Sequence, residues 1–250
     1  MLCTLGSAGV FLLCDTFCRA MKTLTSFLRL LHLADSALPI GSAAHSYGLE
    51  TLASAGYLAP ATLADFLRGY LVENGRLEAA FCWRGVALGA RAADAPTMAA
   101  WLAVNLELSA LKTARESREA SLKLGNRVLH LIADLEQDEH LTAFLTAAER
   151  GGAGVHHACA FGLAGGRLGV DADLVVAAFL RQSMAGLVAA CQKFMALGQS
   201  HAATIQWQLY DLIDTLAQAP TDPATATVFA PLTEIASMRH PYLPVRLFVS

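Results

Sequence analysis

The segment WLAVNLELSALKTARESREASLKLGNRVLHLI, residues 101–132, decides the fold class of this chain. Its apolar residues recur every three or four positions, the spacing that places side chains along one face of an α-helix. These residues are Trp101, Val104, Leu108, Leu111, Leu122, Leu129 and Ile132. The same period continues along nearly the whole chain, without a convincing alternating strand pattern. We therefore predict an all-α fold.

Turn residues on either side of this segment separate further helical stripes. The expected stripes are Leu24, Phe27, Leu28 and Leu31 before Pro39, a second over residues 44–55, and Leu63, Phe66, Leu67 and Tyr70 after Thr62. Gly56 can end the second helix and Thr62 can cap the third. Further helices are expected at residues 77–91, 141–148, 155–168, 171–197 and 201–216. We predict a single-domain bundle of about 8–10 helices with an irregular C-terminal tail.

The composition narrows the class of function. Of the 250 residues, 55% are hydrophobic and 16% are charged, whereas soluble domains average about 45–50% and about 25%. So much apolar surface favours oligomerisation or a protein partner. The net charge of −3 argues against nucleic acid as a ligand.

We expect a soluble chain in a reducing cytoplasm. The apolar runs at residues 174–180 and 184–191 are broken by Arg181 and Lys193, whereas a membrane-spanning helix needs roughly 18 uninterrupted apolar residues. The six cysteines form no C-x-x-C pair, which disfavours a zinc ribbon or a disulfide scaffold. Residues 1–20 imitate a signal peptide poorly, and we expect them to be a dispensable, non-native or disordered extension before Met21.

The first unusual stretch is ALPIGSAAHSYGLET, residues 37–51. Pro39 and Gly41 predict a turn, after which Ser42 can cap a second helix that contains Gly48. In such a helix His45 and Gly48 share one face, and Ser46 and Glu50 share another. The pattern favours a corner between two helices over a catalytic site, because no strand–turn–helix elbow surrounds Ser46.

The second unusual stretch places Arg115 and Arg118 where the stripe of residues 104–111 should continue with apolar residues. Glu116 and Glu119 lie nearby in the sequence. One interpretation is a solvated helix face where the bundle ends. The other is an arginine pair that holds Glu50 or faces a partner, because unpaired buried charge is too costly.

A third cluster, GVHHACAFG, places His156 and Cys159 on one helical face. These two side chains could bind nickel or zinc with help from elsewhere, although the surrounding Ala and Gly also suit close helix packing. No Gly-Lys-Ser/Thr follows the Gly165–Gly166 pair, so a P-loop is excluded. The chain carries no nucleotide-binding fingerprint and no catalytic constellation.

Together these motifs resemble the urease accessory protein F (UreF) family, over about Thr23 to Ser250. The first motif matches through Pro39, Gly41, His45, Ser46, Gly48, Leu49 and Glu50, and the central one through Arg115, Glu116, Arg118 and Gly125. A later element matches through Leu197, Gly198 and Gln199, and the C-terminal signature through Ala236, Arg239, His240, Arg246, Leu247, Phe248 and Ser250. The chain departs from the family pattern at Ser42, Ala43, Pro241 and Val249.

The resemblance implies an all-helical, often dimeric protein without an activity, cofactor or metal site of its own. Such proteins bind a second accessory protein, called UreD or UreH, and through it a nickel-carrying GTPase, UreG. Together they act on the urease apoprotein, which receives nickel. The implied partner-interface residues are Pro39, Gly41, His45, Ser46, Gly48, Glu50, Arg115, Glu116, Arg118, Gln199, Arg239, His240, Arg246, Leu247 and Phe248. The alternative function is a nickel carrier that uses His156, Cys159 and His45.

We divide the chain into the extension at residues 1–20, a helical domain at 21–238 and a docking tail at 239–250. Pro241 and Pro244 exclude helix from the tail. Its apolar side chains are Leu243, Val245, Leu247 and Phe248, and Arg246 adds a planar fork for a carboxylate. We expect the tail to dock onto a partner and to be poorly ordered in the isolated protein.

Overall fold

A computed structural model describes residues 24–218 and 229–249, apart from the side chain of Ala43. These residues form helices and turns and no β-strand, which confirms the all-α prediction. The early helices are residues Leu24–Leu33, α2 (Leu49–Ser54), α3 (Leu63–Tyr70), α4 (Arg76–Gly89) and α5 (Ala95–Leu111). The later ones are α6 (Arg115–Glu136), α7 (Glu139–Gly151), α8 (His157–Arg167), α9 (Ala172–Phe194), α10 (Gln199–Gln208), α11 (Tyr210–Gln218) and α12 (Pro231–Arg239). The expected extension at residues 1–20 lies outside the described part.

Short helical turns link several of these helices. They are η1 (Ser42–Ala44), η2 (Pro60–Thr62), η3 (Leu71–Gly75) and η5 (His240–Tyr242). The predicted stripe on α3 is confirmed, because Leu63 and Leu67 are fully buried and Phe66 and Tyr70 pack against the core.

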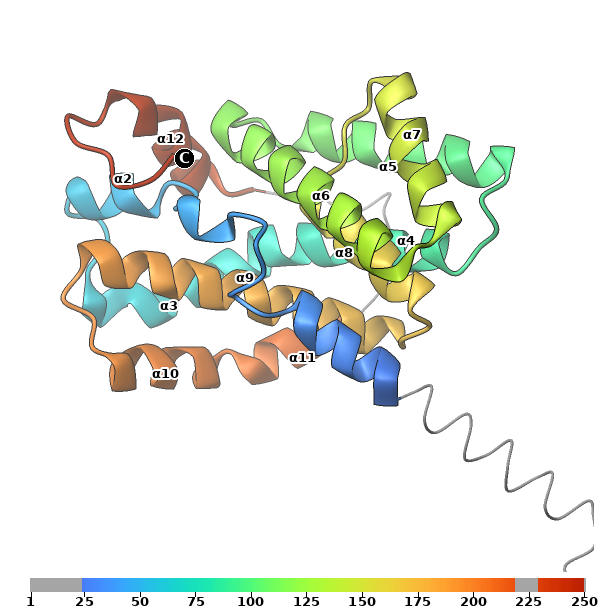
Figure 1. Ribbon diagram of the computed structural model, residues 1–250. Helices are drawn as coiled ribbons and strands as arrows, with labels where there is room; N and C mark the ends of the chain where they lie inside the picture. The colour runs from blue at the N-terminus through green and yellow to red at the C-terminus, as the bar shows by residue number, and fades with distance from the viewer. Residues whose placement is uncertain (1–23, 219–228, 250) are drawn as a thin grey trace, which may run out of the picture.

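Helix α8 forms the centre of the bundle. Every residue from His157 to Gly166 is buried, and α4, α6 and α9 surround it. In Figure 1, α8 lies behind α6, while α12 and α2 lie together at one end of the molecule. The predicted close packing around GVHHACAFG is therefore the central contact of the fold.

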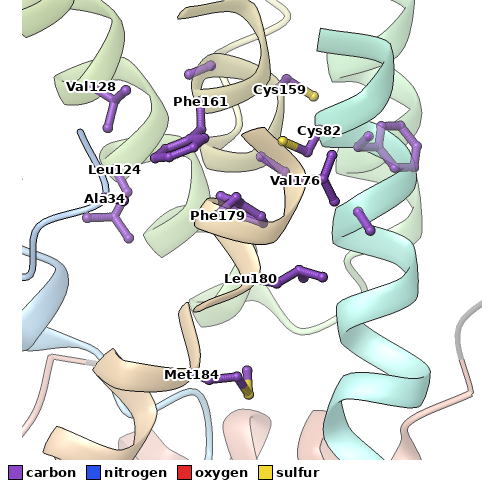
Figure 2. Packing of buried hydrophobic residues seen from close by; sticks show 14 of the residues in the cluster. Ala34, Cys82, Leu124, Val128, Cys159, Phe161, Val176, Phe179, Leu180 and Met184 are labelled. Atoms are coloured by element: carbon purple, nitrogen blue, oxygen red, sulfur yellow. The ribbon is translucent and has the colours of Figure 1, made fainter. Parts of the chain in front are cut away.

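Glycines bring α4 and α8 unusually close together. A Cβ atom placed on Gly162 would lie 2.1 Å from the carbonyl oxygen of Cys82, and one on Gly89 would lie 2.2 Å from that of Leu163. No side chain fits at these distances, so the two backbones are in direct contact along Gly85, Gly89, Gly162 and Gly166. Figure 2 shows Cys82 and Cys159 on these two facing helices. We call this surface the α4–α8 contact.

Helix α9 is continuous through Arg181, in agreement with the single helix expected at residues 171–197. It is long and apolar enough to cross a membrane by length and composition, although 56% of its most apolar window is buried in the bundle. Phe179, Leu180 and Met184 belong to the core cluster drawn in Figure 2. Arg181 is exposed, so the bundle already covers the apolar face while the charge remains in solvent.

The stripe predicted for the first helix faces solvent. Leu24, Phe27, Leu28 and Leu31 are exposed, whereas Leu30, Leu33 and Ala34 are buried. The helix and its stripe are confirmed, but the stripe is not the face that meets the core. Periodicity identifies residues that share a face, and only the neighbouring helices determine which face they cover.

The corner at residues 37–51 also differs from its prediction. Ser42 starts the turn η1, and α2 begins only at Leu49. Gly41 and Gly48 have φ values of 80° and 86°, a left-handed conformation that interrupts the helix and favours glycine. His45 and Ser46 therefore precede α2, and Ser46 and Glu50 do not share a helical face. Gly56 ends α2 with φ 78°, as predicted.

Candidate functional site

Three motifs that lie far apart in the sequence meet where α12 packs on α2 and α6. A Cβ atom on Gly48 would lie 2.8 Å from the carbonyl oxygen of Thr233 and 2.9 Å from the amide nitrogen of Ser237. Ser237 also shares a 2.9 Å hydrogen bond with Ser117 of α6. The absence of a side chain at Gly48 therefore lets α12 approach the corner closely.

His240 joins the three motifs through both nitrogens of its ring. Its Nε2 lies 2.9 Å from a carboxylate oxygen of Glu50, and its Nδ1 lies 2.9 Å from one of Glu116. The His240 side chain is fully buried, and those of Glu50 and Glu116 are 7% and 14% exposed. A carboxyl group therefore lies within hydrogen-bond distance of each ring nitrogen of this one buried imidazole. We call these three residues the carboxylate clamp.

The clamp continues into the C-terminal tail. The backbone N–H of Leu247 donates to the second oxygen of Glu50 at 2.7 Å, and that of Val249 donates to the carbonyl of Ala44 at 2.9 Å. Phe248 is buried, with its ring edge-on to Phe194 at a centroid distance of 5.9 Å. The tail is therefore held on its own bundle, contrary to the expectation that it is poorly ordered when the protein is alone.

Near the clamp, eight large apolar side chains are exposed on α12, on the tail and on the residue Phe229 that precedes α12. These side chains are between 46% and 85% exposed, and they are Phe229, Leu232, Ile235, Met238, Tyr242, Val245, Leu247 and Val249. We call this set the C-terminal face. Single exposed apolar residues are normal on a protein surface, but a concentration of large ones within one short stretch, residues 229–249, is typical of an interaction site.

The two arginines of the central motif do not reach Glu50. Helix α5 ends at Leu111 and α6 begins at Arg115, so the stripe of α5 does not continue through the motif. Arg115 is 77% exposed and pairs with Glu119 at 3.5 Å. Arg118 donates to the carbonyl of Lys112 at 2.7 Å, which satisfies an acceptor at the end of α5. The interpretation in which these arginines hold Glu50 was wrong.

The remaining predicted residues lie at different distances from the clamp. Pro39 and Gly41 are exposed at the corner, where Arg127 donates to the carbonyl of Ile40 at 2.9 Å. Gln199 is exposed at the start of α10, and α10 contacts α3, α9 and α11. Arg239 and Arg246 are exposed near the C-terminal face. The structure thus brings together only part of the predicted set.

His45 and Ser46 are buried inside the corner. Burial, together with the nearby positive charges of Lys123 and Arg127, lowers the pKa of His45 to about 4. Tyr47, which follows Ser46, has φ 50°, a left-handed conformation that is uncommon outside glycine. These residues shape the corner and present little surface to a partner.

The two proposed metal ligands are built into the core. The ring nitrogens of His156 lie 2.8 Å from the hydroxyl of Ser109 and 3.0 Å from that of Ser121. Burial lowers the pKa of His156 to about 3 and raises the pKa of the Cys159 thiol well above its ordinary value. Within residues 24–218 and 229–249, no three His, Cys, Asp or Glu side chains form a group that could hold a metal ion.

A polar cavity that sequence reasoning missed is lined in part by residues of α6 and α12. It has a volume of about 70 Å³, and its lining includes His157 and an ion pair between Lys112 and Glu78. Tyr47 and Tyr70 also line it, and burial raises the pKa of both phenols. No helical spacing connects these residues, because they come from separate parts of the chain.

The family model and the similar proteins that match this chain all point to one family. Residues 58–210 match the UreF family model. The chain is 30% identical to urease accessory protein UreF of Paenarthrobacter aurescens, over 89% of this chain and 97% of that protein. It is 31% identical to UreF of a Nostoc species, over 90% and 96%, and 32% identical to UreF of Actinobacillus pleuropneumoniae, over 88% and 97%.

Proposed function

Because this chain belongs to the UreF family of urease accessory proteins, we propose that it is a non-catalytic scaffold for urease maturation. In this role it binds a UreD/UreH-type accessory protein and a UreG-type GTPase in the cytoplasm. The assembly then delivers nickel to the urease apoprotein. The C-terminal face is the observation that carries the proposal, because it gathers eight exposed apolar side chains on a segment that is fixed to the bundle.

The carboxylate clamp supports this role by holding the face in a defined shape. The buried contacts of His240 and of the Leu247 backbone fix the two ends of the tail relative to α2 and α6. A surface that is ordered before binding loses less conformational entropy when a partner arrives. We therefore assign the clamp a positioning role, and the exposed apolar residues the contact itself.

A second apolar surface supports a homodimer. Leu24, Phe27, Leu28 and Leu31 form an exposed stripe on the helix over residues 24–33, separate in sequence from the C-terminal face. An aspartate at Leu28 should lower the proportion of dimer measured by light scattering after size-exclusion chromatography. An unchanged mass at equal concentration would assign self-association to another surface.

Co-expression with the UreD/UreH-type protein, the GTPase and apo-urease tests the scaffold proposal. Ile235, which is 52% exposed on α12, is replaced by Asp, and the matched control is Leu135→Asp at a position 55% exposed. Leu135 is 19 residues beyond Glu116 on α6, which places it roughly 28 Å along the helix from the clamp. We expect Ile235→Asp to lose the accessory protein and Leu135→Asp to retain it, with both variants keeping the wild-type melting temperature.

Nickel titration of the purified protein separates the scaffold from the carrier alternative. A scaffold should bind nickel weakly, and replacing His156 or Cys159 by Ala should leave that weak binding unchanged. A stoichiometric site below about 1 μM Kd that disappears in these variants would favour the carrier.

In the co-expression experiment, equal loss of the accessory protein from Ile235→Asp and Leu135→Asp would remove the C-terminal face from the proposal.

A further inference from the structure

The C-terminal face ends in two pockets whose lining charges have opposite signs. At the end of α12, a groove of about 380 Å³ is lined by Thr51, Ser54, Ala55, Arg239, Tyr242 and Leu243. At its start, a pocket of about 290 Å³ is lined mainly by apolar surface, with Asp65 and Glu73 as its charged residues. The first lining therefore contains one cation and no carboxylate, and the second contains two carboxylates and no cation.

The groove at Arg239 fits a carboxylate. Arg239 is exposed, and among the described residues its guanidinium makes no ion pair. The neighbouring Glu50 is already bound by His240 and by the Leu247 backbone. The Thr51 hydroxyl is buried in this lining without a hydrogen-bond partner. A planar guanidinium beside hydroxyl groups suits a carboxylate, which can accept two parallel hydrogen bonds.

The pocket at the other end fits an apolar side chain next to a basic one. The rings of Phe66, Tyr70 and Phe229 line it. Glu73 accepts a 3.3 Å hydrogen bond from the backbone N–H of Phe229, which orients one carboxylate at the rim. Asp65 is exposed on α3 and has no cation bonded to it among the described residues. A lysine or arginine from a partner would complete this end.

An apolar stripe runs along α12, whose first residues line one pocket and whose last residue lines the other. Leu232, Ile235 and Met238 recur every three residues along α12 and are about half exposed. The nine residues of α12 span roughly 13 Å, which is between two and three turns of a bound helix or about four residues of an extended segment. The surface is therefore apolar in the middle, positive at one end and negative at the other.

We propose that this surface binds an apolar segment of the UreD/UreH-type partner in one direction only. The segment places an acidic residue in the groove at Arg239 and a basic residue at the rim formed by Asp65 and Glu73. This inference rests on the proposed function, and it adds the chemistry of the bound segment and its orientation. The reversed segment would bring like charges together at both ends.

Charge reversal at each end tests the inference. The variants are Arg239→Glu and Asp65→Lys, with Arg150→Glu and Asp134→Lys as controls that make the same charge changes at exposed sites on α7 and α6. Binding to the purified partner is measured at low and high salt, after circular dichroism has established equal melting temperatures. We expect each test variant to raise Kd about tenfold or more at low salt, by less at high salt, and each control to change it less than about threefold.

The possible outcomes separate the inference from the proposed function. If the wild-type protein binds and both test variants bind equally well, the two-ended charge recognition is wrong while the scaffold proposal stands. If only one test variant loses affinity, the bound segment is not charged at both ends and the fixed direction is overturned. If the wild-type protein itself does not capture the partner, the proposed function and this inference both fall.

Discussion

The α4–α8 contact and the carboxylate clamp both join distant parts of the chain, but they use opposite means. At the first, four glycines remove side chains so that backbones touch within the centre of the bundle. At the second, three ionisable side chains meet at the edge, beneath the tail. The first contact has no room to rearrange, whereas the second can open by releasing a terminal segment.

This difference predicts how each region fails. A tightly packed interior transmits any added volume to its neighbours, so damage at α8 should lower the stability of the whole bundle. The clamp attaches α12 and the tail, which lie at the end of the chain, so damage there should unfold them locally.

The largest effect is expected from Gly162→Ala. Its new Cβ atom would lie 2.1 Å from the Cys82 carbonyl oxygen, so α4 and α8 must separate, and we expect a loss of more than about 3 kcal/mol in the free energy of unfolding. Chemical denaturation measures this loss. Gly186→Ala on α9 is the control, because open space surrounds the position that its Cβ atom would take, and it should stabilise by about 0.5–1 kcal/mol. Equal melting of the two variants would contradict the close-contact account.

His240→Ala should cost about 2–3 kcal/mol, because it leaves Glu50 and Glu116 buried without their shared donor. The loss should be local. Limited proteolysis should cleave the variant within residues 240–249 under conditions in which the wild-type protein resists, while α8 amides keep their protection from hydrogen exchange. Loss of protection throughout α8 would show that the clamp is part of the global core and would remove the distinction between the two regions.

Acidification should lower the free energy of unfolding through His156, which precedes α8, by an amount similar to that expected for His240→Ala. With the pKa of His156 lowered from 6.5 to about 3 by burial and then by Lys112 and Arg118, the folded chain stays neutral there while the unfolded chain takes up a proton. Stability is therefore full above pH 6.5 and falls as the pH drops towards 3. The loss from this residue alone is about 2 kcal/mol between about pH 7 and pH 5. Denaturation across this range should show a shallower slope for His156→Gln, and an identical slope would refute the assignment.

The smallest effect is expected from Arg115→Gln. Arg115 is 77% exposed, with a single ion pair to Glu119 on the same helix, so the change in unfolding free energy should stay below about 0.5 kcal/mol. Arg118→Gln is the paired variant and should cost more, because its guanidinium satisfies a carbonyl at the end of α5. A larger loss for Arg115 than for Arg118 would show that the burial of the central motif has been misjudged.

The sequence was sufficient to predict most of the helices, but it was not sufficient to predict which faces of the helices contact one another. The stripe of α3 and the end of α2 at Gly56 were predicted from local rules. The stripe over Leu24–Leu31 identified a helix, but it did not reveal which face of that helix meets the core. The break at residues 112–114 was missed because Lys112, Thr113 and Ala114 include no proline or glycine to mark a helix end.

By itself, the sequence determined the all-α class, the family and the motifs that matter, because helical periodicity and motif spacing are properties of neighbouring residues. Only the tertiary structure decided that Glu50, Glu116 and His240 form one cluster. His240 lies 190 residues from Glu50 and 124 from Glu116 in sequence, and no local rule connects positions so distant. They are in contact because the absence of a side chain at Gly48 lets α12 pack beside α2, and because α12 also packs on α6. The packing of these helices therefore determines that Glu50 bonds to a histidine, whereas one interpretation of the sequence paired it with an arginine.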